Sequence, residues 1–586
     1  MLKIFAAVSV VLVLTAVSAQ LSHAEGLRYG IEGVGKEARE NIRAYLGESP
    51  KENATAEQFI NTAPRLTAEA LEALGFYDPV IELQVDRTKR PWAATINVQP
   101  GEPLTYTAVS VRILGEGQED QSLTALMDAQ TPKLGDRVHH GRYEVLKQEL
   151  LQLARRRGYF DADFPESRVA VDVGKRQAAL SLVFDAGRRY RFGAVSIDES
   201  ILDRDLLNRL LPFEPGAPYE QKLLLELRQR LLRLGYFGSV TVLPQLPERV
   251  YPDVPIRVAL STASRHSYEL GVGFSTDTRQ RLSLTWQSPR LNRWGHSQET
   301  ALRWSPINPQ ARVTYSIPLD DPANDVLQLI GRLENNEFGD LESEQRELRV
   351  RRERTKAGIV RSLQFRGLNE QWGVFSDDFD ASFVLAGASV SSRYRRGNAV
   401  DPSRGVSQFY SVEGASADLG SDEDLLRFYG TVTALRTLGE RWRVVGRVEA
   451  GALWTSSDKP SELPPSLAFF AGGDSSIRGF AYQSVGREAT AEGFSSAQPN
   501  ESLIVGGTRL LTGSLELQRY VTEKWRAAVF VDAGDAFDSG DFDARVGLGI
   551  GIHYLSPVGA LRFEIANPVS ESGGSWRVHV NIGAEF

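Results

Sequence analysis

The residues of this chain that are best placed to do chemistry are one arginine and one carboxylate. Arg478 lies in the glycine-rich stretch Ala471-Gly-Gly-Asp-Ser-Ser-Ile-Arg-Gly-Phe480, and Asp532 lies in Phe530-Val-Asp-Ala-Gly534. A guanidinium and a carboxylate form a strong, charge-assisted hydrogen-bonded pair. The chemistry that these residues predict is the binding of one segment of the chain to another.

Signals for catalysis or cofactor binding are weak. The chain has no cysteine, so it offers no thiolate as a nucleophile or metal ligand. No Gly-x-Ser-x-Gly elbow surrounds Ser475 or Ser476. We therefore expect a protein that is not an enzyme and that uses neither a cofactor nor a bound metal. The net charge of −8 argues against nucleic acid as a partner.

Two further motifs have ordinary explanations. The stretch 30–36 resembles a phosphate-binding loop, but Glu37 stands where Ser or Thr would hold Mg²⁺, so we expect a turn between a strand and a helix. The pair His139-His140 has no second cluster of ligands nearby, and we expect it in a solvated loop.

The N-terminus has the pattern of a secretory signal peptide. Lys3 precedes an apolar core, and Ser22-His23-Ala24 has the small-x-small form of a cleavage site. We assign residues 1–24 to this signal, so that the mature chain begins near Glu25. No later run of 18 apolar residues exists, so a membrane role would require a β-barrel.

The segment that carries Asp532 reads as a strand with two different faces. The even-numbered positions of this strand hold Phe530, Asp532 and Gly534, and the odd-numbered positions hold Val529, Val531 and Ala533. Side chains alternate between the two faces of a strand. We expect the apolar set to face lipid and the set with Asp532 to face a polar lumen, where Gly534 would leave room for an incoming backbone.

Alternation of this kind continues from Tyr268 to the C-terminus. The last strand is the clearest, with Trp576, Val578, Val580, Ile582, Ala584 and Phe586 on one face. Full charges on the polar face and aromatic residues at strand ends favour a membrane barrel over a soluble sandwich, which remains the alternative. About 320 residues at about 20 per strand and turn predict an antiparallel transmembrane β-barrel of 16 strands over 265–586.

The arginine lies in a long connection between two of these strands. One strand ends at Trp454 and the next begins near Ser502, which leaves a loop of 455–501. Loops of this length are usually functional or disordered. The dense apolar and glycine residues around Arg478 favour a packed element that folds inward.

Residues 27–264 read as three tandem α+β repeats. A glycine followed by an aromatic pair closes a helical pattern at Gly75, Gly158 and Gly235, and Ala-Val-Ser recurs at 108 and 194. Each repeat reads as a strand, two helices and two strands, which resembles the POTRA domain. We assign the three domains to 27–104, 105–188 and 189–264.

Together these features are similar to the BamA/TamA superfamily of outer-membrane assembly factors. In that family the tip of loop six folds into the lumen and docks on a Phe-x-Asp-x-Gly strand. The resemblance assigns the loop-six motif to Gly472, Gly473, Asp474, Ile477, Arg478, Gly479 and Phe480, and the docking site to Phe530, Asp532 and Gly534.

The resemblance also implies a mechanism and partners. The first and last strands would meet at a weak lateral seam, where substrate strands are added. It assigns this seam to Tyr268, Leu270, Gly271, Gly273, Val580, Ile582, Gly583 and Phe586. The implied partners are unfolded outer-membrane or autotransporter substrates, outer-membrane lipid, and a TamB-like inner-membrane-anchored protein that docks at the first POTRA domain. The POTRA domains would lie in the periplasm.

Three POTRA domains resemble the TamA-like branch, although Ser475 stands where that branch often has a basic residue. Two alternatives within the superfamily remain. One is a BamA-like general assembly factor, which usually has five POTRA domains, and the other is a two-partner secretion transporter, which has two POTRA domains and a plug helix. A lipase-fused barrel would need a serine elbow, and a diffusion porin would lack the repeats and the loop motif.

Overall fold

The computed structural model describes residues 26–198, 201–375, 377–398, 400–456, 463–490, 502–557, 559–571 and 573–583. The predicted signal peptide and Phe586 lie outside these residues. The chain divides into two compact units, one of which holds residues up to Ala194 with Pro215–Lys222 and Gln245–Pro255, and the other the remainder. No helix among the described residues is both long and apolar enough to cross a membrane.

Each N-terminal repeat has the predicted order of strand, two helices and two strands. The first contains β1 (Leu27–Glu32), α1 (Lys36–Leu46), α2 (Asn53–Glu72), β2 (Val80–Asp86) and β3 (Trp92–Gln99). The second contains β4 (Thr105–Leu114), η1 (Gly115–Glu119), α3 (Gln121–Gln130), α4 (His140–Arg156), β5 (Asp163–Asp172) and β6 (Gln177–Asp185). The third contains β7 (Arg191–Asp198), α5 (Arg204–Arg209), α6 (Gln221–Arg233), β8 (Phe237–Pro244), η2 (Leu246–Glu248) and β9 (Asp253–Thr262).

The three sheets share one topology. Their strand orders are β1-β3-β2, β4-β6-β5 and β7-β9-β8, so the last strand of each repeat lies in the middle. In the first two repeats the central strand runs parallel to the first strand and antiparallel to the second. Each sheet therefore has two edge strands, and in the first repeat these are β1 and β2.

The recurrent glycines end helices and pack closely against neighbouring segments of the chain. Gly75 and Gly158 have φ of 89° and 90°, the left-handed conformation that a helix end favours. A Cβ on Gly75 would lie 2.4 Å from the Val138 carbonyl oxygen, and one on Gly158 would lie 2.9 Å from Cβ of Tyr219. Conformation and close packing therefore both require glycine at these positions.

The sequence-derived helix faces are buried as predicted. The positions four and eight residues before each glycine are all buried: Thr67, Leu71, Leu150, Ala154, Leu227 and Leu231. The expected turn after β1 is present, since β1 ends at Glu32 and α1 begins at Lys36. The prediction of a solvated loop at His139 and His140 is wrong, because His139 caps α4 and His140 Nε2 lies 2.6 Å from the Tyr77 hydroxyl.

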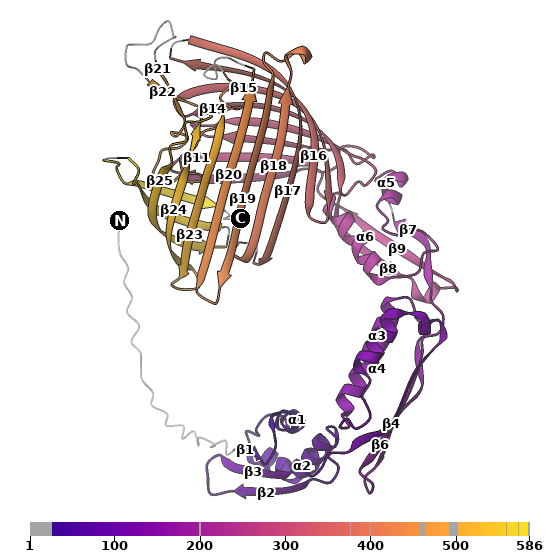
Figure 1. Ribbon diagram of the computed structural model, residues 1–586. Coiled ribbons are helices and arrows are strands. Elements are labelled where there is room, and N and C mark those ends of the chain that lie inside the picture. Colours follow the sequence, from indigo (N-terminus) through magenta and orange to yellow (C-terminus); the bar gives the residue numbers. More distant parts are fainter. Residues whose placement is uncertain are drawn as a thin grey trace, which may run out of the picture. The chain divides into compact units, whose positions relative to one another are not determined.

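The C-terminal region is a closed antiparallel barrel of 16 strands (Figure 1), and the predicted fold class is confirmed. Its first eight strands are β10 (Ser267–Ser275), β11 (Arg279–Ser288), β12 (Ser297–Trp304), β13 (Gln310–Pro318), β14 (Asp325–Phe338), β15 (Leu341–Lys356), β16 (Ile359–Val374) and β17 (Asp377–Gly397). The others are β18 (Pro402–Ala415), β19 (Leu425–Leu438), β20 (Trp442–Thr455), β23 (Arg509–Tyr520), β24 (Trp525–Phe537), β25 (Arg545–Ser556), β26 (Gly559–Pro568) and β27 (Arg577–Gly583). The short helix η3 (Ala417–Leu419) lies between β18 and β19.

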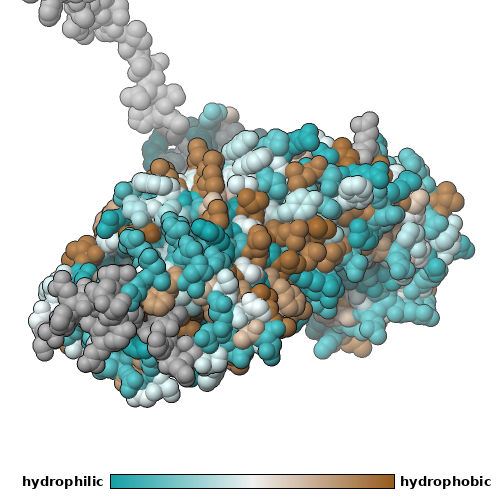
Figure 2. Space-filling model, turned by 90° about the horizontal axis from the view of Figure 1, so that it is seen from above, coloured by the Kyte–Doolittle hydropathy of each residue, from teal (hydrophilic) through white to brown (hydrophobic). Residues whose placement is uncertain are grey.

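Side-chain exposure alternates along the barrel strands. On β24 the residues Arg526, Ala528, Phe530 and Asp532 are buried in the lumen, whereas Val529 is 52% exposed on the outer wall. A polar interior and an apolar exterior are typical of a barrel in lipid. The view from above shows hydrophobic side chains gathered in patches between hydrophilic ones (Figure 2).

The connection between β20 and β23, here called loop six, is packed against the inside of the wall. It contains the small hairpin of β21 (Arg487–Thr490) and β22 (Ser502–Val505). Leu467, Phe469, Ile477 and Phe480 of the loop are buried in one apolar cluster with wall residues such as Phe383. Burial of these side chains holds the described part of loop six inside the barrel.

Candidate functional site at loop six and the barrel seam

Arg478 at the tip of loop six binds Asp532 on β24 through both guanidinium and backbone. Its Nε and Nη2 donate to the two oxygens of Asp532 at 2.7 and 2.9 Å, and its backbone N–H donates to Oδ2 at 2.9 Å. Arg478 is 4% exposed and Asp532 is fully buried. The structure thus places together the two residues that the sequence motifs single out.

Other lumen side chains complete the site around Arg478. Its Nη1 donates to Glu516 on β23 at 2.7 Å and to Glu564 on β26 at 3.0 Å, while Nη2 donates to the Ser514 hydroxyl at 3.2 Å. The guanidinium carbon lies 3.3 Å from the ring centroid of Phe530, as a cation–π contact. Besides Asp532, four wall residues on three strands therefore contact the guanidinium of Arg478.

The same cluster contains the ligand-type side chains that come closest to a metal-site arrangement among the described residues. Glu516, His553 and Glu564 are buried, and their ligand atoms lie within 4.8 Å of one another. Both carboxylates already bind the guanidinium of Arg478. The cation that this pocket holds is therefore the arginine of loop six.

Room for the loop backbone comes from a glycine other than the predicted one. A Cβ on Gly547 of β25 would lie 1.8 Å from the carbonyl oxygen of Arg478, and one on Gly549 would lie 2.3 Å from Cζ of Phe530. The missing side chain of Gly534 instead faces β23, where a Cβ would lie 2.3 Å from the Leu511 carbonyl oxygen. The interpretation of Gly534 as the space for loop six is therefore corrected to Gly547.

The turn that presents Arg478 depends on glycine. Gly472, Gly473 and Gly479 have φ of 100°, 102° and 100°, a region that other residues rarely adopt. Ile477 and Phe480 flank the arginine and are buried in the apolar cluster, which fixes the turn on both sides.

The first and last strands close the barrel through a minimal ladder. Among the described residues, β10 and β27 share the pair Ser275–Asn581, whereas β26 pairs with β27 from Ala560–Gly583 to Ala566–Arg577. Beyond β10, the Thr276 backbone N–H donates to the Val580 carbonyl at 3.2 Å. In the described part of the chain, the seam is therefore joined only at the C-terminal end of β10.

The structure separates the residues predicted for this seam into two groups. Tyr268 and Leu270 pair with β11 and are 67% and 81% exposed on the outer wall, without a described partner on β27. On the other strand, Val580, Ile582 and Gly583 pair with β26.

The two predicted seam glycines on β10 face the lumen. A Cβ on Gly271 would lie 2.4 Å from the Ser283 hydroxyl of β11, and one on Gly273 would lie 3.6 Å from Arg281 Nε. Among the described residues their nearest neighbours thus lie on β11, and their part in the seam stays a prediction.

Asp474 links loop six to both strands of the seam, a connection that no sequence motif indicated. Its Oδ2 accepts hydrogen bonds from the Ser275 hydroxyl of β10 and from Asn581 Nδ2 of β27, each at 2.9 Å. Its backbone N–H donates to Asp277, in the turn after β10, at 2.6 Å. Burial, together with the neighbouring charge of Asp474, raises the pKa of the Asp277 carboxyl to about 8.

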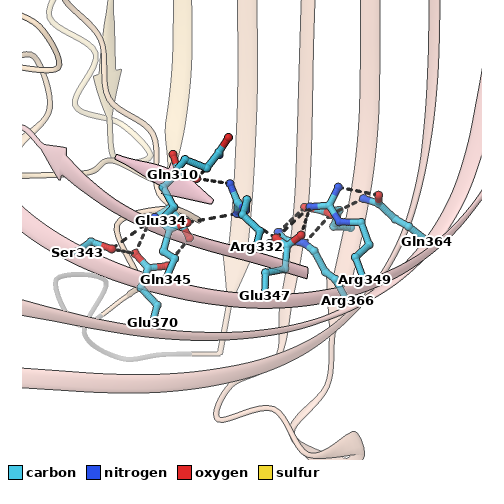
Figure 3. A network of polar contacts seen from close by, with 12 residues as sticks. Gln310, Arg332, Glu334, Ser343, Gln345, Glu347, Arg349, Gln364, Arg366 and Glu370 are labelled. Atoms are coloured by element: carbon cyan, nitrogen blue, oxygen red, sulfur yellow. Dashed lines mark hydrogen bonds and ion pairs between the residues drawn. The ribbon is translucent and has the colours of Figure 1, made fainter. Parts of the chain in front are cut away.

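A second polar network lines the lumen face of β14 to β18 (Figure 3). Glu347 is 4% exposed and lies 3.0 Å from Arg332, 2.8 Å from Arg349 and 3.3 Å from Arg366, which also pairs with Glu413 at 2.9 Å. The alternating charges along β15 could have indicated such a network from the sequence. They do not show which residues of the neighbouring strands pair with them.

Wall side chains also bind the backbone of loop six. Glu370 of β16 accepts from the Ser466 N–H at 3.1 Å, and Arg447 of β20 donates to the Ser476 carbonyl at 2.6 Å. The backbone N–H of Gly479 donates to His579 on β27 at 3.0 Å. Loop six is thereby tied to opposite parts of the wall as well as to the seam.

Comparisons with known proteins agree with this geometry. Residues 261–586 match the Omp85 superfamily domain, residues 28–100 match POTRA domain TamA domain 1, and residues 190–260 match a POTRA family described as surface antigen variable number repeat. The middle repeat has the same strand order as its neighbours.

The comparison with solved structures found a BamA structure that shares the fold. The crystal structure of BamA from Haemophilus ducreyi lacking POTRA domains 1–3 is 18% identical, with a TM-score of 0.67, and covers 81% of this chain and 100% of its own. CdiB from Acinetobacter baumannii is 14% identical with a TM-score of 0.44, over 94% of this chain and 99% of its own. The Omp85 match spans more than half of the sequence, so the chain belongs to the Omp85 superfamily, as an outer-membrane insertase or transporter whose POTRA domains lie in the periplasm.

Proposed function

We propose that the protein inserts or translocates β-barrel or autotransporter proteins through the seam between β10 and β27. The observation that carries this proposal is the short ladder of that seam, which joins the strands at Ser275 and Asn581. From Ser267 to Phe274, the strand β10 pairs with β11 on one side and has no described ladder partner on the other. An unpaired strand edge is a template for another strand.

The substrate is accordingly an extended segment with alternating side chains. It adds to the β27 side of β10 by main-chain hydrogen bonds, while its apolar face meets lipid beside Leu270 and Val272, which are 81% and 85% exposed. Few backbone hydrogen bonds join the described residues of the two seam strands, so little resists their separation there. Outer-membrane lipid at this seam is therefore part of the working site.

A disulfide across the seam tests the proposal. The chain has no native cysteine, so Ser275→Cys with Asn581→Cys creates a single pair in register. We expect oxidation to abolish assembly of a barrel substrate or secretion of an autotransporter passenger, and reduction to restore it. Full activity with the crosslink formed would refute the seam mechanism.

The matched control joins two strands that are already paired. Ser283→Cys with Arg303→Cys links β11 to β12, where the two residues are also partners in register. This crosslink should leave activity unchanged in both redox states. Equal loss in both variants would mean that rigidity of the barrel in general, and not opening of this seam, is required.

We further propose that the first POTRA domain binds a TamB-like, inner-membrane-anchored partner. The match of residues 28–100 to a TamA-type POTRA domain supports this assignment. The edge strand β2 supplies a surface for strand addition, and Val80 on it is 55% exposed. The alternative, a general assembly factor, would not require such a partner.

Photocrosslinking tests the partner. A photoreactive residue at Val80 should capture an inner-membrane-anchored protein in intact envelopes, whereas the same residue at Tyr45 on α1, which is 43% exposed, should not. Absence of capture from every position along β2, with substrate assembly intact, would contradict the docking proposal.

A further inference from the structure

A large groove lies on the outer wall of the barrel at the end nearest the third repeat. It has a volume of about 1500 Å³ and is lined by α6, by the turn between β13 and β14, and by β15 to β19. All of the residues that line it belong to the same compact unit. The third repeat is a POTRA domain, so this groove lies at the periplasmic edge of the membrane.

The groove changes from charged to apolar within two residues along the strands. On the outward face of β15 and β16, Arg354 pairs with Arg361, the next outward pair is Arg352 with Leu363, and the pair after that is Val350 with Phe365. Leu363 and Phe365 are 64% and 65% exposed. This order is the profile of a membrane interface, with charge at the headgroups and apolar side chains at the acyl chains.

Basic residues outnumber carboxylates in the groove, since six basic side chains line it together with Glu226, Asp320, Asp321 and Asp325. Asp325 accepts from Arg352 and Arg354 at 2.7 and 2.6 Å, and Glu226 accepts from Arg230 at 2.7 Å.

Three more basic residues line the groove and take no part in these ion pairs. In the described part of the chain, no carboxylate forms an ion pair with Arg233, Lys356 or Arg361, all of which line the groove. Arg361 moreover lies directly opposite Arg354 on the neighbouring strand. Like charges in cross-strand register repel unless an anion lies between them.

The other wall of the groove suits hydrocarbon. Phe428, Tyr410 and Val390 line it and are 44%, 44% and 37% exposed on the lipid-facing side. An inorganic anion would satisfy the arginines but would leave this apolar wall uncovered. A ligand with an anionic head and acyl chains covers both surfaces.

We propose that this groove binds an anionic glycerophospholipid of the periplasmic leaflet. Its phosphodiester lies between Arg354 and Arg361, with Lys356 and Arg233 beside it, and its acyl chains lie along Leu363 and Phe428. The site is separate from the seam and from loop six, so it does not depend on the function proposed above.

Lipid retention by the full-length protein tests this inference. The protein is reconstituted in nanodiscs of phosphatidylglycerol and phosphatidylethanolamine, and the lipids that remain bound after detergent extraction are counted by native mass spectrometry. We expect wild-type protein to retain phosphatidylglycerol selectively. Lys356→Gln and Arg361→Gln should each weaken this retention about fivefold, as expected for the loss of one basic residue near a lipid surface.

The matched control is Arg346→Gln. Arg346 lies on β15 with Lys356 and on the same outer face, but toward the other end of the strand, and its side chain is 60% exposed. It should retain phosphatidylglycerol as wild type does. Leu363→Asn should weaken lipid retention while leaving the binding of inorganic phosphate unchanged, which distinguishes a lipid site from a simple anion site.

Three outcomes would overturn the proposal. They are equal retention of the two lipids by wild type, equal loss in Arg346→Gln and Arg361→Gln, and displacement of the lipid by inorganic phosphate at matched concentration. Heat-modifiable migration of each variant verifies that its barrel has folded, so that loss of lipid is not loss of structure.

Discussion

Asp474 accepts a hydrogen bond from Asn581 at 2.9 Å, so the tip of loop six is bound to the last strand of the barrel. The same carboxylate oxygen accepts from Ser275 on the first strand, also at 2.9 Å. These are the two residues that pair across the seam. The loop that packs inside the barrel and the seam that would open are thus joined at one side chain.

Removal of that carboxylate should loosen the seam. Asp474→Ala deletes two hydrogen bonds to a charged acceptor, each worth about 1.5–3 kcal/mol. Spin labels on the outward residues Tyr268 and Ile582 should then report a broader distance distribution by pulsed electron resonance. Ser475→Ala, one residue away, is the control and should leave the distribution unchanged. The same distribution in all three proteins would show that Asp474 does not hold the seam.

The pH dependence of the barrel should report on Asp277. Its pKa is raised from 3.8 to about 8, chiefly by burial and then by the charge of Asp474. Between about pH 4 and about pH 8 the folded state therefore binds one proton more at this residue than the unfolded state does. Its contribution to the free energy of unfolding falls as pH rises through that window and stays constant above it. Thermal unfolding in detergent at several pH values measures this slope. Asp277→Asn should flatten it, and an unchanged slope in that variant would assign the effect elsewhere.

Much of the fold could be predicted from the sequence because its signals are local. Period-two alternation indicates barrel strands, and a glycine before an aromatic pair marks each helix end at Gly75 and Gly158. Strand parity also placed Asp532 on the lumen face. These signals depend on near neighbours in the chain, which the sequence displays directly.

The rest depended on how strands are staggered around the barrel. Parity shows that Glu516 and Glu564 face the lumen, but only the stagger decides that both reach Arg478. The same stagger brings Ser275 to Asn581 across the seam. Gly547 was missed for this reason too, since nothing along β25 indicates which glycine lies beneath the loop.

Loss of the arginine should destabilise the barrel. Arg478→Ala leaves Asp532, Glu516 and Glu564 buried without their cation, and breaking a buried ion pair typically costs about 3–5 kcal/mol. The temperature at which the folded band disappears in semi-native electrophoresis should fall, and a protease should cleave loop six faster. Arg478→Lys should recover only part of this loss, because an ammonium cannot bind Asp532 through two parallel hydrogen bonds. Wild-type stability of Arg478→Ala would contradict docking of the loop.

Filling the space at Gly547 should displace loop six even with Arg478 present. A Cβ there would lie 1.8 Å from the Arg478 carbonyl oxygen, so Gly547→Ala requires either the loop or β25 to move. Overpacking of this kind costs about 1–3 kcal/mol or more. Gly367→Ala on β16 is the control, since no atom lies within 4 Å of the added Cβ. We expect rapid proteolysis of loop six in Gly547→Ala and wild-type resistance in Gly367→Ala. Equal resistance in the two variants would mean that the loop does not press on β25 in the membrane.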